Sequence, residues 1–168
     1  MRGAPGSMDD QTWRDGYALL DATELHFELQ TPYWHLDAAS DLAADFPQTT
    51  IALNHCGLPA DRSEEGLLAW RRALEMLARN ENVRIKLSGL GVSPGVWPQA
   101  QNIEIIQTAI GIFGPRRAMF ASNFPVDGLC VDMNTMFTTY KIGVADMTEA
   151  DIRALFCDNS AALYRLRA

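Results

Sequence analysis

The sequence predicts an α/β fold built from parallel β/α units. Short apolar runs, typical of strands that are buried on both faces, alternate along the chain with amphipathic segments of helical period. The alternation repeats four times, which favours right-handed crossovers and therefore parallel strands. Several apolar runs end abruptly in polar residues, as expected where the carboxyl ends of parallel strands form a site.

The ends of the predicted elements carry recognisable signals. Ser63 and Thr148 are suitable helix N-caps, and Gly114-Pro115 is a common helix stop. The predicted strands are 25–30, 49–54, 83–87 and 118–121. The predicted helices are 13–22, 37–46, 63–79, 102–113, 133–142 and 148–157, with a last turn or helix over 160–165.

Residues 1–12 are rich in Gly, Pro and Ser, so we expect an N-terminal loop or the remnant of a truncated segment there. One domain is then expected over residues 13–168, because a chain of 168 residues that is 48% hydrophobic can bury one core. No apolar run approaches the ~20 residues that a membrane span needs.

Charge and cysteine usage restrict the partners and the compartment. The formal net charge of −7 argues against binding to nucleic acid or to an anionic membrane, which need clustered basic residues. The three cysteines form no C-x-x-C pair, so we expect no disulfide framework and a cytoplasmic location. A small-molecule substrate is the expected partner.

Four polar side chains at strand ends are candidates for chemistry. His55 follows one predicted strand, and Asn123 follows another. Lys86 and Ser88 lie at the end of the strand between them. If the alternation of side chains continues, His55 shares a face with Leu53, and these groups converge at the mouth of a barrel. A neutral imidazole there can bind a metal or polarise a carbonyl, and a desolvated lysine of lowered pKa can hold a carboxylate.

Each candidate also has a purely structural interpretation. His55 can be a hydrogen-bonded structural residue, and Lys86 can be solvated. Ser88 can serve a turn, and Asn123 can bond its local backbone in an Asx turn. Asp127, in the loop after the last strand, is either an acid/base group or, as its loop position favours, a surface carboxylate.

Gln30, Tyr33 and Trp34 follow the first predicted strand. The two aromatic residues suit a substrate wall or simple loop packing. Familiar catalytic motifs are missing from the sequence: the glycines from Gly89 to Gly95 have the wrong spacing for G-x-G-x-x-G, and there is no P-loop, G-x-S-x-G, H-E-x-x-H or H-x-H.

Four blocks of sequence, at 46–59, 84–90, 113–125 and 155–164, together resemble the amidohydrolase-related family. This branch of the metal-dependent TIM-barrel hydrolases includes sugar lactonases and a pyrone-dicarboxylate lactonase. The likeness covers roughly residues 9–166. It implies a (β/α)8 barrel, of which this chain would be the C-terminal half with strands five to eight.

The resemblance also implies roles for the candidate residues. The reaction would be attack by water on a lactone or similar carbonyl compound. His55 would be the sixth-strand histidine, catalytic and a candidate metal ligand, and Asn123 occupies the place where many relatives carry an aspartate that activates water. Because an amide does not titrate near neutral pH, Asp127 is the substitute base. The implied substrate-binding residues are Gln30, Tyr33, Trp34, Lys86 and Ser88.

The implied cofactor is a divalent metal, zinc or manganese, whose ligand set is incomplete here because the H-x-H pair of strand one is absent. A half-barrel would expose two strand edges and an apolar inner face, so we expect the chain either to form a homo-oligomer that closes the barrel or to be only marginally stable alone. Two rivals stay open. One is a non-catalytic remnant used for binding or self-assembly, and the other is a doubly wound domain, whose sheet would reverse its strand order.

Overall fold

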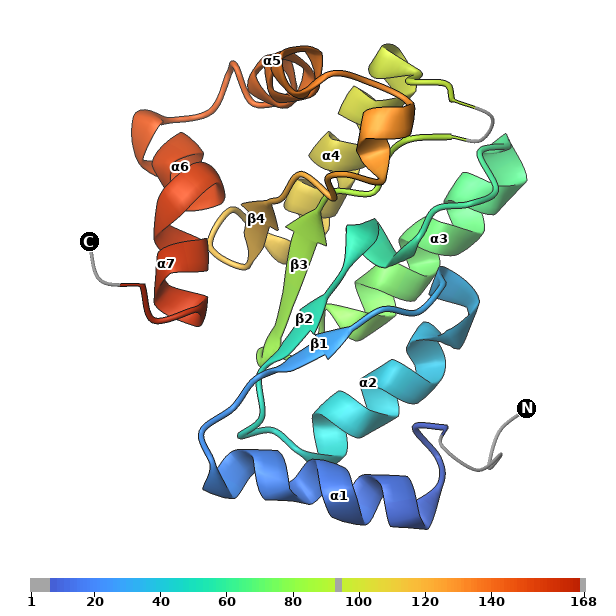
Figure 1. The fold of residues 1–168 in the computed structure, drawn as a ribbon. Helices are drawn as coiled ribbons and strands as arrows, with labels where there is room; N and C mark the ends of the chain where they lie inside the picture. Colours follow the sequence, from blue (N-terminus) through green and yellow to red (C-terminus); the bar gives the residue numbers. More distant parts are fainter. Residues whose placement is uncertain (1–6, 93–94, 167–168) are drawn as a thin grey trace.

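Four parallel strands form the centre of the molecule and lie side by side in chain order (Figure 1). The computed structural model describes residues 7–92 and 95–166. The sequential order confirms the predicted β/α units and contradicts the doubly wound alternative, which needs a reversal of strand order. The strands are β1 (Phe27–Leu29), β2 (Ile51–Leu53), β3 (Val83–Leu87) and β4 (Ala118–Phe120).

The predicted helices are all present, with shifts at their ends. The first begins at Gln11 rather than at residue 13, because the Asp10 side chain accepts a hydrogen bond from the Trp13 backbone and caps it. The predicted caps Ser63 and Thr148 are confirmed. The α-helices are α1 (Gln11–Ala22), α2 (Leu36–Asp45), α3 (Glu64–Leu77), α4 (Gln99–Phe113), α5 (Met133–Gly143), α6 (Glu149–Arg153) and α7 (Asn159–Leu163).

Irregular turns replace the ends of several predicted elements. The helix predicted over 148–157 continues from α6 as a π-helical turn over Ala154–Asp158, which leads directly into α7. Three of the strands are shorter than predicted, although Asn54 and Ala121, just beyond β2 and β4, still donate backbone hydrogen bonds to the neighbouring strands. The 3₁₀ turns η1 (Tyr33–His35), η2 (His55–Gly57) and η3 (Asp127–Leu129) follow β1, β2 and β4.

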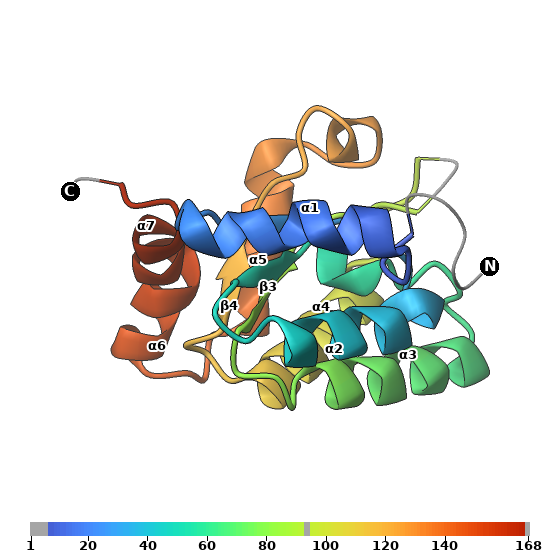
Figure 2. The ribbon, with the colours of Figure 1, turned by 90° about the horizontal axis from the view of Figure 1, so that it is seen from below.

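The apolar core lies between the sheet and helices α2, α3 and α4, which run side by side along one face (Figure 2). Strand register places Ile51 beside Val83 and Leu53 beside Ile85, and all four side chains are fully buried. Trp70 of α3 packs into the same core. This packing fixes the strands, and so fixes the positions of the loops at their carboxyl ends.

The opposite face of the sheet, which would line a barrel, is polar. Lys86 and Glu28 lie on this face and form an ion pair, with 2.8 Å between Nζ and Oε2. The hydroxyl of Tyr164, just after α7, donates to the other oxygen of Glu28 at 2.5 Å. The expectation of an apolar inner face is therefore wrong in part: the ion pair lies beside the buried Ala52 and Met119, and the segment after α7 covers part of this face.

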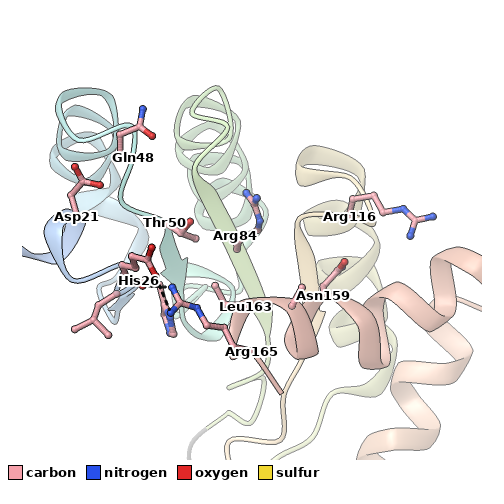
Figure 3. Close-up of a pocket in the computed structure, with 12 residues that line it drawn as sticks. Asp21, His26, Gln48, Thr50, Arg84, Arg116, Asn159, Leu163 and Arg165 are labelled. Atoms are coloured by element: carbon pink, nitrogen blue, oxygen red, sulfur yellow. Dashed lines mark hydrogen bonds and ion pairs between the residues drawn. The ribbon is translucent and has the colours of Figure 1, made fainter. Parts of the chain in front are cut away.

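A hollow of about 840 Å³ lies at the amino ends of the strands (Figure 3). His26, Thr50 and Arg84 line it from three neighbouring strands or the residues just before them, and Leu163 lines it from α7. Chemistry in parallel α/β folds takes place at the carboxyl ends of the strands. We therefore interpret this hollow as the open bottom of the sheet rather than as the reactive site.

Within residues 7–92 and 95–166, no helix is both long and apolar enough to cross a lipid bilayer.

Candidate functional site

The carboxyl ends of β2, β3 and β4 meet at one edge of the sheet and bring four side chains together. We call His55, Ser88, Asn123 and Asp127 the carboxyl-edge site. Contacts between neighbouring loops connect all four residues, and the next paragraphs describe them. This gathering agrees with the prediction that polar residues at the strand ends would converge.

His55 lies in a turn rather than on a strand. Strand β2 ends at Leu53, and His55 and Cys56 both have left-handed backbone angles, with φ of 55° and 53°. Such angles are uncommon for residues other than glycine and often occur at functional sites. The prediction that His55 shares a face with Leu53 is wrong, because the turn breaks the alternation: Leu53 lies in the core, and the imidazole contacts the loop after β3.

Gly89 allows the imidazole to lie against the backbone of that loop. A Cβ atom added at Gly89 would lie 2.6 Å from Cβ of His55 and 2.8 Å from its Nδ1, and the glycine has a φ of +65°. The neighbouring hydroxyl of Ser88 lies 3.0 Å from Nδ1 of His55. Ser88 is almost fully buried, so it positions the imidazole and has little surface to offer a substrate.

The surroundings of His55 favour its neutral form. Burial lowers the pKa of the imidazole below its usual value of 6.5, and the charge of Lys86 lowers it further. The carboxylates of Asp127 and Glu28 act in the opposite direction but do not outweigh burial. At neutral pH the ring is therefore uncharged, with one nitrogen occupied by Ser88 and no hydrogen bond from Nε2 to any residue in 7–92 or 95–166.

Asp127 is a buried carboxylate, only 3% exposed. Its Oδ2 accepts a hydrogen bond from the Leu90 backbone N–H at 3.2 Å, and its Oδ1 accepts one from the Asn123 amide at 3.0 Å. The favoured interpretation as a surface carboxylate is wrong. The turn η3 folds the segment back on the sheet and directs this side chain inward, a change of direction that no periodic pattern encodes.

Asn123 has a left-handed φ of 53°, and its side chain bonds to Asp127 rather than to neighbouring backbone in an Asx turn. The backbone N–H of Asp127 donates to the Asn123 carbonyl at 3.1 Å, which closes the loop on itself. The amide therefore fixes one oxygen of the carboxylate and leaves its own carbonyl oxygen for another donor.

Lys86 is paired with a carboxylate and has a raised pKa, whereas the sequence predicted a lowered pKa. Burial alone would lower its pKa, but the hydrogen bonds and charge of Glu28, with a smaller effect of Tyr164, raise the pKa above its usual value. The prediction of a lowered lysine pKa is wrong because Glu28, 58 residues earlier in the chain, faces Lys86 and forms an ion pair with it. Its ammonium is already neutralised by that carboxylate.

The other predicted substrate residues lie after β1. Gln30 is exposed, and Trp34 is 56% exposed on η1, where its ring meets Tyr33 edge-on at 5.1 Å. Across the parts of the chain that the structure describes, no hydrogen bond or ring contact joins these three residues to His55. They lie on the same edge of the sheet but one strand away.

No three His, Cys, Asp or Glu side chains group closely enough to hold a metal ion in residues 7–92 and 95–166. His55 and Asp127 alone do not make a metal site. The residues present therefore do not fit a complete zinc or manganese centre.

Arg62 was not identified from the sequence, although it belongs to this edge. It lies in the loop after His55, half-buried, with guanidinium contacts to the Leu90 carbonyl and the Asn102 side chain, both at 3.3 Å. The sequence contains one signal for this residue: a basic side chain in the loop after His55, shortly after the apolar and small segment 57–60.

A sequential parallel sheet with polar groups at its carboxyl edge defines the class of parallel α/β proteins. The chain belongs to the amidohydrolase family: the family model described as Amidohydrolase matches residues 2–166, nearly the whole chain.

Two curated relatives illustrate the family relationship. The chain is 38% identical over 154 residues to the protein named y4mH of Sinorhizobium fredii, covering 92% of this chain and 52% of that protein. It is 32% identical over 130 residues to an L-fucono-1,5-lactonase of Burkholderia multivorans, covering 71% of this chain and 44% of the lactonase. The chain thus spans about half the length of the curated relatives it matches.

Solved structures agree with this assignment. An amidohydrolase from Burkholderia multivorans, crystallised with HEPES and in another crystal form with zinc, superposes with a TM-score of 0.87 at 26% identity. The match covers 96% of this chain and 60% of that protein.

Proposed function

We propose that this chain is the C-terminal half, with strands five to eight, of a (β/α)8 hydrolase that adds water to a lactone or similar carbonyl compound. The observation that carries the proposal is a neutral, desolvated imidazole beside a buried carboxylate at the carboxyl edge of a sequential parallel sheet. Burying polar, titratable groups costs stability. A non-catalytic remnant used for binding or assembly would have no reason to retain these buried groups. The relationship to an L-fucono-1,5-lactonase supports the lactone as substrate class.

His55 would polarise the carbonyl of the substrate. If the Ser88 hydroxyl donates to Nδ1, the neutral ring carries its proton on Nε2 and can donate it to the carbonyl oxygen. The developing negative charge on that oxygen then meets a fixed donor in a site that is partly shielded from water.

Asp127 would take the proton of the attacking water, and Asn123 would orient both the Asp127 carboxylate and the water. As the water oxygen bonds to the carbonyl carbon, its proton passes to the carboxylate. When the ring C–O bond breaks, the leaving alkoxide takes that proton, and the product is a hydroxy acid. Gln30, Tyr33 and Trp34 would contact the substrate from the neighbouring loop.

A divalent metal in the complete protein would supply Lewis-acid polarisation of the carbonyl or of water. His55 would bind such a metal through Nε2, with the ring proton then on Nδ1 and donated to Ser88, so metal binding would replace the hydrogen bond from Nε2 to the carbonyl. The described residues lack the other ligands of a complete set. The proton transfers above use only side chains of this chain.

The test is turnover of a panel of five- and six-membered sugar lactones, L-fucono-1,5-lactone included, by the full-length gene product. We expect His55→Ala to lower kcat/KM by about 100-fold or more, the usual effect of losing a general acid or base. His26→Ala is the matched control, because that histidine lies at the opposite edge of the sheet and should retain turnover. Unchanged turnover in His55→Ala would remove this residue from the mechanism.

A further inference from the structure

Arg62 is a half-buried cation whose charge is not neutralised. No carboxylate of residues 7–92 or 95–166 lies within ion-pair distance of its guanidinium, and its two hydrogen bonds go to neutral oxygens at 3.3 Å, longer than the usual N–H···O distance. Burial lowers the pKa of Arg62, as expected for a charge that has lost water without gaining a counter-ion.

Arg117 shows what a structural arginine looks like in this protein. Its guanidinium donates to the carbonyls of Phe113, Ala78 and Asn80 at 3.0 to 3.1 Å. It also lies 3.9 Å from a carboxylate oxygen of Glu81. Arg62 has neither the short contacts to carbonyl groups nor a nearby carboxylate. A structural role, in which the guanidinium holds two loops together by hydrogen bonds, therefore does not account for its five N–H donors.

The guanidinium borders a hollow of about 330 Å³ between the loop 58–62 and the loop 89–92. Gly89 and Gly91 form part of the wall. A Cβ atom at Gly91 would lie 2.7 Å from Sγ of Cys130 and 3.3 Å from Oδ1 of Asp127, and Gly89 lies against His55. Through these two glycines, the wall of the hollow is in contact with both proposed catalytic side chains.

A second polar group near Arg62 also lacks a partner. Asn102, which receives one hydrogen bond from Arg62, is fully buried, and its amide nitrogen has no acceptor. Buried donors without partners are rare in native proteins. Within the described residues, the corner beside the hollow therefore has an amide donor without an acceptor and a guanidinium without a paired carboxylate.

We propose that this hollow is a carboxylate subsite of the active site, in which Arg62 binds a carboxylate that the substrate carries away from its reacting carbonyl. A guanidinium matches a carboxylate with two parallel N–H···O bonds, and a ligand carboxylate would supply the counter-charge that the protein lacks. The assignment rests on the proposed hydrolase function and specifies it: the preferred substrates are anionic lactones.

The experiment measures binding without turnover. Tetrahydropyran-2-carboxylate and tetrahydropyran-2-carboxamide, a six-membered ring with and without the charge, are titrated calorimetrically into the full-length protein. We expect the wild type to bind the carboxylate at least tenfold more tightly than the carboxamide. Arg62→Gln should abolish this preference, and Arg72→Gln, which removes a charge from the exposed surface of α3, should retain it.

Absence of a preference in the wild type would overturn the subsite, as would an intact preference in a folded Arg62→Gln protein. If Arg62→Gln does not fold, Arg62→Lys is the variant to test, because lysine keeps the positive charge but lacks the planar guanidinium. A carboxylate preference reduced at least threefold in Arg62→Lys supports the subsite, and an unchanged preference refutes it. Carboxylate preference in a protein that hydrolyses no lactone keeps the subsite and rejects the hydrolase; hydrolysis without the preference rejects the subsite alone.

Discussion

The charge state of His55 depends on neighbours that act in different directions. Burial against the loop after β3 and the positive charge of Lys86 lower its pKa, and the carboxylates of Asp127 and Glu28 raise it. Removing the Asp127 charge should therefore lower the pKa of His55 further. NMR titration of the imidazole is expected to give a value below 6.5 in the wild type and a lower value in Asp127→Asn. An equal or higher value in the variant would mean that the two groups do not interact.

The amide at position 123 is suited to the buried carboxylate at position 127. Asn123→Asp would place two carboxyl groups about one hydrogen bond apart, where the wild-type donor and acceptor are separated by 3.0 Å. Like charge and burial would raise the pKa of the pair above that of the unfolded chain, so the folded state would bind more protons. The stability of the variant should therefore fall, relative to the wild type, as pH rises through the raised pKa.

We expect Asn123→Asp to cost about 1–3 kcal/mol of unfolding free energy at pH 8 and much less at pH 4. Urea unfolding at the two pH values measures the difference. Asn134→Asp, an exposed site in the first turn of α5, is the control with the same change in charge and should be nearly neutral. A pH-independent cost in Asn123→Asp would contradict the coupling with Asp127.

At this scale the sequence identified which residues gather but not how each is oriented. His55, Ser88 and Asn123 could be predicted because each follows an apolar run, and the carboxyl ends of parallel strands share one edge. The inward direction of Asp127 depends on a 3₁₀ turn, and the pairing of Lys86 depends on Glu28. The place of Arg62 at this site could not be predicted, because its burial results from two loops that meet only in the folded chain.

At the scale of elements, the periodic signals were reliable and the turns were not. Helix caps and breakers are local chemistry, so Ser63, Thr148 and Gly114 could be placed from the sequence. The left-handed turns after β2 and β4 depend on contacts between loops, so alternation mispredicted the face of His55. The same contacts give the loop after β3 its influence on the site.

Gly89→Ala tests that influence. The added methyl group would collide with His55 and would require a left-handed backbone, so we expect a loss of about 1–3 kcal/mol in stability together with a loss of lactone turnover. The matched control is Gly111→Ala on the exposed side of α4, where nothing lies within 4 Å of the new Cβ. That variant should gain about 0.5–1 kcal/mol, because glycine is unfavourable within a helix. Thermal or urea unfolding of both variants measures the change in stability. Full lactone turnover in Gly89→Ala would show that the loop after β3 does not influence the site.

At the scale of the whole molecule, the sheet has two open edges. Within residues 7–92 and 95–166, β1 pairs only with β2, and β4 pairs only with β3. The large hydrophobic residues Leu25 and Leu166, 56% and 63% exposed, lie just before β1 and shortly after α7. Unpaired edges and exposed hydrophobic groups favour association, whereas the paired charges on the inner face and the net charge of −7 limit it. A segment that continues the parallel sheet would satisfy both edges at once.

We therefore expect the 168-residue chain, produced alone, to self-associate with rising concentration in light scattering, or else to exchange its edge amides rapidly. Hydrogen exchange should be fast in β1 and β4 and slow in β3, which is paired on both sides and serves as the internal control. Co-expression with the part of the y4mH relative that this chain does not match should suppress association and slow exchange at both edges, because that part can supply the missing parallel strands. A concentration-independent monomer with uniformly slow exchange would show that the four-stranded unit is complete by itself, and the half-barrel interpretation would then fail.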